Sequence, residues 1–236
     1  MERLSASEKP LVLYPVETLR QASAPAVLPL DTHLTDHGSL EVLRLILDVL
    51  DIQAHETLDH IAARITRTQR WSGDLGKRFT PPLLQDTLVL DPDWKITELR
   101  SPGGFNDGMI DLVFSPEAAV DGTLLLFGDS FFRMMLKHLS AVFSRVVHLR
   151  SRFLHPEMAT LIRPDYILTG NAERYLANVQ PDDEAHAFCL YPQLRNEEIV
   201  PMDSDFLAAW HAVTAPKSSV AKSYWHARGI QLAPLS

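Results

Sequence analysis

The sequence predicts an α/β fold with three layers, in which a doubly wound, mostly parallel sheet is covered by helices and carries a small β insertion. Two observations support this prediction. From Leu124 onward, apolar runs typical of strands alternate with amphipathic runs typical of helices, and such alternation indicates a parallel sheet. The chain also has 236 residues, 46% of them hydrophobic, which is enough for one α/β domain with a sizeable core.

We therefore expect a single domain over residues 1–236, with its core at about residues 11–178 and an extension at residues 179–236. In the first part of the chain, apolar spacing and turn formers predict a strand at Leu11–Tyr14, helices at Leu40–Leu50 and Leu58–Arg67, a loop at Trp71–Phe79, and strands at Thr87–Leu90, Lys95–Leu99 and Met109–Phe114. The last three strands would form a hairpin or a small insertion. The turn-rich segment Ser101–Gly108 is either a hairpin tip or a mobile lid.

The second part of the chain carries the alternating pattern. A buried strand ends at Gly128, and the following elements are predicted to be a helix at Phe131–Val142, a strand at Arg145–Leu149, a helix at Pro156–Ile162, a strand at Tyr166–Thr169, and helices at Ala172–Asn178, Asp205–Val213 and Ser218–Ala227. Each predicted parallel strand is thus followed by a helix.

Charge and composition exclude several classes of partner. The formal net charge is −8, whereas binding of nucleic acid or of an anionic membrane requires a basic face, so we expect no nucleic-acid partner. Cys189 is the single cysteine, so no intrachain disulfide can form, and we expect a core thiol. No apolar run approaches the ~18 residues of a membrane span, and Met1–Pro10 is polar, so we expect neither a span nor a secretion signal in this chain.

The most informative segment is LLLFGDSFF at Leu124–Phe132, where an apolar run ends in Gly128-Asp129-Ser130. The pattern predicts a strand, a tight turn and a helix, with the Ser130 hydroxyl at the carboxyl end of a buried strand. Open α/β sheets bind ligands at that edge, and the backbone N–H groups at a helix start can receive an oxyanion. Ser130 is therefore a candidate nucleophile. The alternative is that Asp129 and Ser130 simply begin a helix.

A second polar segment, DTHLTDHG at Asp31–Gly38, favours the catalytic interpretation. Asp31 and His33 are two residues apart, so in an extended chain their side chains project to the same side. Asp31 could then hold His33 in one tautomer, while the other ring nitrogen takes a proton from Ser130. The alternative is an ordinary loop histidine.

Four motifs in this order, DTHLTDHG, SGDLG, LLLFGDSF and RPDYILTGNAERYL, resemble the SGNH-hydrolase-like proteins of the alginate O-acetyltransferase family. The match covers about residues 11–176. The resemblance implies an SGNH or flavodoxin-like sheet, with Ser130 as nucleophile, His33 as general base and Asp31 as the carboxylate that orients it. It also implies that the SGDLG segment, which begins after Trp71, packs beside the active site, and Trp71 is a candidate for substrate binding.

Two departures from the family pattern affect the site. Leu34 stands where the family usually has a tryptophan, which puts sugar contact there in doubt. Thr169-Gly170-Asn171 replaces the usual Trp-Glu pair and is more similar to the Gly-x-Asn block of ordinary SGNH hydrolases. Asn171 could donate to an oxyanion together with the Ser130 N–H, or it could be a turn residue that caps the next helix.

Two further groups of residues are candidates for ligand binding. Arg150 and Arg152, near a predicted strand end, could face an anionic sugar, although solvated arginines are more common. His33 and His37 lie four apart, near Asp31 and Asp36, but Gly38 interrupts the predicted start of the helix that would carry them, so we predict no metal site. We also predict no cofactor.

The sequence thus predicts serine-dependent acyl transfer, in which an acetyl-serine is resolved by a sugar hydroxyl or by water. By resemblance, we favour a polysaccharide O-acetyltransferase that acts on an exopolysaccharide or cell-envelope glycan. The partners implied are an acetylated carbohydrate and a membrane-bound acetyl-donor protein, and the implied location is extracytoplasmic. The alternatives are a carbohydrate acetylesterase, a glycan-binding or assembly module without catalysis, and a metal-dependent hydrolase.

Overall fold

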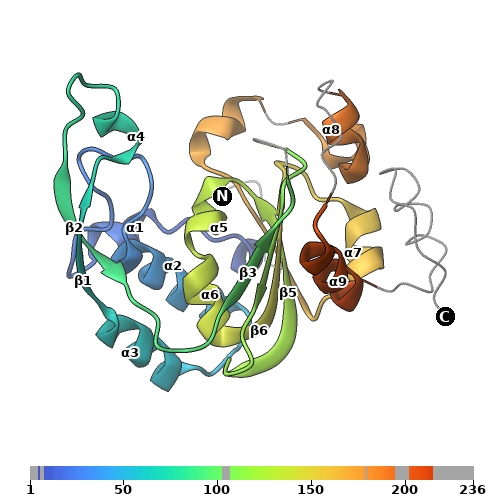
Figure 1. Ribbon diagram of the computed structural model, residues 1–236, viewed down its shortest axis with the longest axis horizontal. Coiled ribbons are helices and arrows are strands. Elements are labelled where there is room, and N and C mark those ends of the chain that lie inside the picture. The colour runs from blue at the N-terminus through green and yellow to red at the C-terminus, as the bar shows by residue number, and fades with distance from the viewer. Residues whose placement is uncertain (1–4, 6–7, 103–106, 179, 195–201, 215–236) are drawn as a thin grey trace. The chain divides into compact units, whose positions relative to one another are not determined.

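The computed structural model describes residues 5, 8–102, 107–178, 180–194 and 202–214. The chain divides into two compact units, coloured along the sequence in Figure 1. Unit 1 comprises Met1–Lys95 and Lys137–Val142, and unit 2 comprises Ile96–Leu136 and Phe143–Ser236. Among the described residues, no helix combines the length and the apolar character that a membrane crossing requires.

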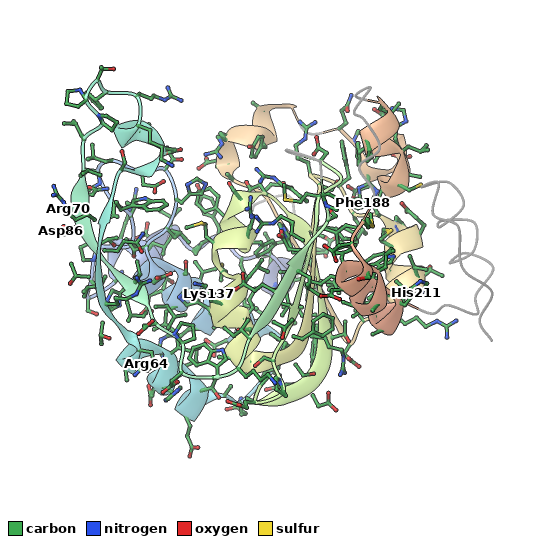
Figure 2. All side chains as sticks on the ribbon, in the orientation of Figure 1. Arg64, Arg70, Asp86, Lys137, Phe188 and His211 are labelled. Carbon is green, nitrogen blue, oxygen red and sulfur yellow. The ribbon has the colours of Figure 1, made fainter. Side chains whose placement is uncertain are left out.

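Unit 1 consists mainly of helices and one small sheet. Its elements are η1 (Lys9–Leu11), α1 (Val16–Arg20), α2 (Asp36–Val49), α3 (His55–Ala63), β1 (Ile65–Trp71), α4 (Gly73–Gly76), β2 (Gln85–Leu90) and most of α6 (Leu136–Val142). Strands β1 and β2 pair antiparallel, with Arg70 opposite Asp86 on exposed faces (Figure 2). This hairpin is a sheet of its own.

Helix α2 packs in unit 1 through one apolar face. It buries Leu40, Leu43 and Leu47, whose spacing of three and four residues places them on one face. Thr35 is its N-cap, because the side chain accepts a hydrogen bond from the Gly38 N–H at 3.0 Å. The predicted helix at Leu40–Leu50 is confirmed, and the cap makes it begin four residues earlier, at Asp36.

Unit 2 contains the main sheet. Its elements are β3 (Thr97–Arg100), β4 (Ile110–Phe114), β5 (Val120–Gly128), α5 (Ser130–Met134), β6 (Phe143–Arg150), α7 (Pro156–Ile162), β7 (Tyr166–Gly170), η2 (Glu173–Asn178), η3 (Asp182–Glu184), η4 (Phe188–Leu190), α8 (Tyr191–Leu194) and α9 (Ser204–Val213). The strand order is β3-β4-β6-β5-β7. Strand β5 pairs parallel with β6 and β7, whereas β4 pairs antiparallel with β3 and β6, so the sheet is mixed.

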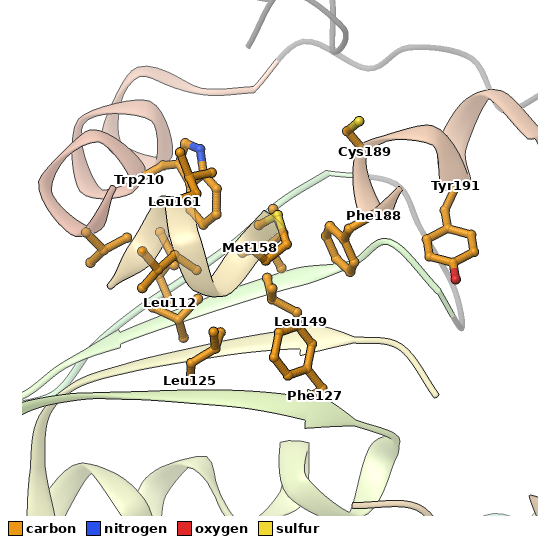
Figure 3. Close-up of a cluster of buried hydrophobic side chains, with 14 of the residues drawn as sticks. Leu112, Leu125, Phe127, Leu149, Met158, Leu161, Phe188, Cys189, Tyr191 and Trp210 are labelled. Carbon is orange, nitrogen blue, oxygen red and sulfur yellow. The ribbon is translucent and has the colours of Figure 1, made fainter. Parts of the chain in front are cut away.

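Alternating side chains of this sheet build the core of unit 2. Leu125 and Phe127 of β5 point to the face covered by α7 and α9, into the cluster that also contains Met158, Leu161 and Trp210 (Figure 3). Cys189 is buried in the same cluster, as predicted. Strand β5 is buried on both faces, which explains its unbroken apolar run.

Several predicted elements are confirmed, including the helix at Pro156–Ile162, whose proline stands in the first turn. The strands predicted at Lys95–Leu99 and Met109–Phe114 form a hairpin, β3–β4, which extends the main sheet instead of standing apart as an insertion. The tip of that hairpin falls partly on residues 103–106, outside the described part of the chain. The helix predicted at Ser218–Ala227 also lies outside it.

Other predictions were wrong. The helix predicted at Leu58–Arg67 ends at Ala63, because the chain from Ile65 pairs with β2. The strand predicted at Leu11–Tyr14 is absent: η1 ends at Leu11, and residues 12–14 pair with no strand in the described structure. The predicted helix at Phe131–Val142 is two helices, and the predicted loop at Trp71–Phe79 contains α4.

The burial of β5 predicts a large cost for shortening its side chains. Leu125 is 0% exposed, so Leu125→Ala should lower the free energy of unfolding by about 2–5 kcal/mol through lost burial and the remaining cavity. Ile167 of β7 is 42% exposed, so Ile167→Ala should cost about 1 kcal/mol or less. Urea unfolding followed by circular dichroism measures both, and equal losses would contradict the assigned burial.

Candidate active site

The predicted pair of Asp31 and His33 forms in unit 1. The His33 Nδ1 and Asp31 Oδ1 atoms lie 2.9 Å apart, and the same oxygen accepts the His33 backbone N–H at 3.1 Å. The Trp71 indole N–H donates to the other oxygen, Asp31 Oδ2. Both oxygens of Asp31 therefore have donors, and the imidazole is held through Nδ1. With Nδ1 protonated, Nε2 is the basic nitrogen of the ring.

Close backbone packing positions this loop. Gly73 has a φ of 59°, and a Cβ at this position would lie 1.9 Å from the Leu30 carbonyl oxygen, so glycine is required there. The Leu75 and Gly76 N–H groups donate to that carbonyl at 3.2 and 3.1 Å. Asp74 accepts the Thr32 N–H at 2.8 Å and also binds the Thr32 hydroxyl. The SGDLG segment thus packs directly on the loop that carries Asp31 and His33.

The electrostatics of Asp31 favour its ionised form. Burial raises the pKa of Asp31, but the hydrogen bonds from Trp71 and His33 outweigh burial and hold the pKa below its ordinary value. A carboxylate in this state orients a neighbouring imidazole and stabilises it when it becomes charged.

One group of side chains in the described residues has ligand atoms close enough to hold a metal ion. It consists of Asp31, His33 and Asp74, whose ligand atoms lie within 4.8 Å of one another. The oxygens of both aspartates already accept hydrogen bonds from His33, Trp71 and Thr32. This arrangement matches an oriented histidine better than an open set of metal ligands.

The predicted strand, turn and helix around Ser130 form in unit 2. Strand β5 ends at Gly128, and Ser130 is the first residue of α5 and is half-buried. Asp129 is buried and accepts two backbone hydrogen bonds, from Phe131 N–H at 2.9 Å and from Ala172 N–H at 2.8 Å. Its carboxylate therefore fastens the turn to the segment that follows β7, and Asp129 is a structural residue.

The end of β5 also depends on two glycines. Gly128 and Gly170 are partners across the β5–β7 ladder. A Cβ on Gly128 would lie 2.5 Å from the Gly170 carbonyl oxygen, and a Cβ on Gly170 would lie 2.6 Å from the Phe132 ring. The two glycines thus let Phe132 of α5 pack directly over the strand ends.

A pocket of about 260 Å³ opens at the carboxyl ends of β5 and β6. Its lining includes Gly128, Asp129, Arg150, Ser151 and Arg152, so both predicted arginines lie in it, together with Asp107 and Tyr175. Asn171, the oxyanion candidate, donates from Nδ2 to the Arg152 carbonyl at 3.1 Å. Unit 2 therefore brings Arg150 and Arg152 to one pocket beside the turn that precedes Ser130, and Asn171 bonds to its wall.

Sequence reasoning missed two histidine networks in unit 2. His148 binds Asp111, and Asp111 binds Arg100. The Ser151 Oγ and His155 Nε2 atoms lie 2.6 Å apart, and His155 is packed among aromatic rings that include Phe127, Phe188 and Tyr191. A polar residue at a buried position of an apolar strand, such as His148 in β6, is the signal that could have found the first network.

Fold and site together define an α/β protein with a mixed five-stranded sheet and a serine at the carboxyl end of its central parallel strand. No protein-family model and no curated protein matches the sequence. The fold is similar to the crystal structure of a DHHW family protein from Eubacterium siraeum, with a TM-score of 0.50 and 10% identity over 68% of this chain. The match covers 63% of that protein, less than two thirds of its length.

Two further solved structures are similar at a lower level. PatB1 of Bacillus cereus has a TM-score of 0.49 and 11% identity, with 70% of this chain and 69% of that chain covered. PatB1 with a sulfonyl adduct has a TM-score of 0.48 and 11% identity, with coverage of 68% and 67%. At these identities, the comparison with the DHHW family protein supports a distant relation of fold.

The hydrogen bond from Trp71 predicts a pH-dependent contribution to stability. Trp71→Phe removes the indole donor, so it should cost about 1 kcal/mol while Asp31 is ionised. The pKa of Asp31 is lower in the folded protein than in the unfolded chain. The stabilisation is therefore fully present at a pH above the pKa of Asp31 in the unfolded chain, and it is lost as the pH falls through the pKa of Asp31 in the folded protein. The cost should therefore be larger at about pH 5 than at about pH 3.

Urea unfolding at both pH values measures this difference. Trp94→Phe is the matched control, because the Trp94 indole N–H donates to the Ser140 hydroxyl, which does not titrate in this range. The Trp94→Phe cost should be the same at both pH values. A Trp71→Phe cost that does not change with pH would contradict the role assigned to the Asp31 carboxylate.

Proposed function

We propose that the protein catalyses serine-dependent acyl transfer as an O-acetyltransferase of an exopolysaccharide or cell-envelope glycan. The observation that carries this proposal is the geometry around His33. Its Nδ1 is held by a buried carboxylate at 2.9 Å, which makes Nε2 the basic nitrogen and leaves the imidazole suited to accept a proton. Ser130 at the end of β5 is the nucleophile that this base would serve.

In the proposed reaction, His33 Nε2 takes the proton of Ser130 as Oγ attacks the carbonyl carbon of an acetyl ester. The Ser130 backbone N–H and the Asn171 amide stabilise the oxyanion of the tetrahedral intermediate. Its collapse breaks the ester bond, and the leaving alkoxide takes the proton from His33. A sugar hydroxyl, deprotonated by His33, then attacks the acetyl-serine, and Ser130 recovers its proton.

The arrangement of unit 2 supports the finer SGNH-like, three-layer assignment. Strand β5 lies between two parallel neighbours, β6 and β7, and Ser130 and Asn171 follow the ends of β5 and β7. We assign Arg150 and Arg152 to the acceptor site because both line the pocket beside Asp129. From the family resemblance, we assign Trp71 to substrate contact. The resemblance also implies that the acetyl donor is a membrane-bound protein and that the reaction takes place outside the cytoplasmic membrane.

Two other functions use the same scaffold. A carbohydrate acetylesterase would share every step up to the acetyl-serine and would then use water in place of the sugar hydroxyl. A glycan-binding module without catalysis is favoured by one observation, Leu34 in place of the aromatic residue that usually follows the histidine. Such a module should bind glycan without reacting with a serine-directed phosphonate.

The reaction predicts that two substitutions abolish turnover of p-nitrophenyl acetate. Ser130→Ala removes the nucleophile and His33→Ala removes the base, and each should lower kcat at least about 1,000-fold. Matched controls are Ser144→Ala and His55→Ala, which change residues that bind Asp121 and Gln53. Both controls should keep wild-type turnover.

Short oligosaccharide acceptors added to the same assay distinguish the functions. Acetylated oligosaccharide among the products supports the transferase, whereas release of acetate alone supports the esterase. Equal rates in wild type, Ser130→Ala and His33→Ala would contradict catalysis by these residues. Inhibition of the wild type by a chelator would instead support the metal-dependent hydrolase.

The oxyanion assignment predicts a separate effect for Asn171. Asn171→Ala should lower kcat roughly 10²–10³-fold, because one such donor stabilises the transition state by ~2.7–4 kcal/mol. The Asn171 amide also donates to the Arg152 carbonyl, so the thermal midpoint must be measured beside kcat. Unchanged turnover in a folded variant would remove Asn171 from the mechanism.

A further inference from the structure

His148 lies within unit 2 beneath the turn that carries Ser130, and it is 0% exposed. It is the partner of Asp111 across the β4–β6 ladder, and its Nδ1 is 3.0 Å from Asp111 Oδ2. Its Nε2 is 3.3 Å from the carbonyl oxygen of Gly128, the last residue of β5. One imidazole thus joins three adjacent strands, β4, β6 and β5.

Both ring nitrogens of His148 face acceptors. A neutral imidazole carries one N–H, so either tautomer would direct a lone pair at an oxygen, whereas the doubly protonated ring donates to both. Asp111 is the counter-charge: burial raises its pKa, but the hydrogen bonds from His148 and Arg100 outweigh burial and hold the pKa below its ordinary value. Arg100 Nε donates to the second oxygen, Asp111 Oδ1.

Burial of a charged network costs desolvation free energy, and this cost is offset only where each charged group has its hydrogen-bond partners. Asp111 is 2% exposed and has a donor on each oxygen. A histidine between a carboxylate and a carbonyl therefore has a defined orientation. Its two anchor points lie on different strands, so it fixes the position of the Gly128 carbonyl relative to β4.

The Gly128 carbonyl and the Asp129 carboxylate are two polar groups that hold the Gly128-Asp129-Ser130 turn. Asp129 holds the other side through the Phe131 and Ala172 N–H groups. Loss of the His148 bond would remove the hydrogen bond that links the Gly128 carbonyl to β6 and, through Asp111, to β4.

We propose that His148 is a positioning residue, doubly protonated between Asp111 and the Gly128 carbonyl, which sets the place of Ser130 for attack. This inference rests on the proposed function of Ser130 as nucleophile. His148 is 0% exposed, so in this role it acts through the turn and is not itself a catalytic residue.

The protonation of His148 is tested first, without reference to activity. The full chain with ¹⁵N-labelled histidine rings is examined by NMR at neutral pH, and the His148 signals are assigned by their loss in His148→Gln. We expect hydrogens on both ring nitrogens. A single ring hydrogen would overturn the inference.

The positioning role is tested by a pair of amide variants. The amide nitrogen of Gln can occupy the place of Nε2 and donate to the Gly128 carbonyl, whereas that of Asn can occupy the place of Nδ1 and donate to Asp111. We expect His148→Asn to lower kcat for p-nitrophenyl acetate about 10–100-fold with little change in KM, because displacement of a reacting group by about 1 Å costs about 100-fold. His148→Gln should retain more of kcat at a similar thermal midpoint.

Equal kcat in the two variants, or wild-type kcat in His148→Asn, would overturn the positioning role. The rate at which a sulfonyl fluoride labels Ser130, located by mass spectrometry, should fall in the same order as kcat. A wild-type protein that is neither labelled at Ser130 nor active would refute the proposed function and the positioning role together. The NMR result would still decide the protonation state of His148 in that case.

Discussion

The parallel ladder of β5 with β6 and β7 is the constraint on which unit 2 depends. Because β5 is hydrogen-bonded on both sides and buried on both faces, its end cannot shift without its neighbours. The turn at Ser130, the pocket with Arg150 and the loop at Asn171 all follow the carboxyl ends of these three strands. Parallel strands bring their ends to one edge, which explains why residues far apart in sequence share one region.

In unit 1, hydrogen bonds and close backbone packing, not a large sheet, hold the candidate residues in place. Its sheet has two strands, and the loop with Asp31 and His33 has no regular secondary structure. Hydrogen bonds from Trp71 and to Asp74, together with the close approach of Gly73 to Leu30, replace the ladder. At the buried Asp31 carboxylate, loss of a donor would cost free energy because the oxygen would be left unsatisfied.

Local signals account for what could be predicted from the sequence. The helix at Pro156–Ile162 and the short strand at Tyr166–Thr169 follow from apolar spacing and flanking turn formers, and Asp31 and His33 are close because they lie two positions apart in the sequence. Pairing between distant segments could not be predicted. Ile65 continues the helical spacing of Leu58 and Ile61, so its place in β1 is set by β2, about 20 residues further on. The contact of His148 with Asp111 depends on the register of β4 and β6 in the same way.

The hydrogen bonds of Asp129 affect how conservation at this position in related sequences should be interpreted. Each oxygen accepts a different backbone N–H, so an asparagine would set its NH₂ group against one of those donors, and an alanine would leave both N–H groups unpaired. Selection on folding alone can therefore keep an aspartate beside Ser130. An aspartate conserved at this position in relatives would then reflect its two structural hydrogen bonds. Its conservation would not show that this carboxylate takes part in a reaction.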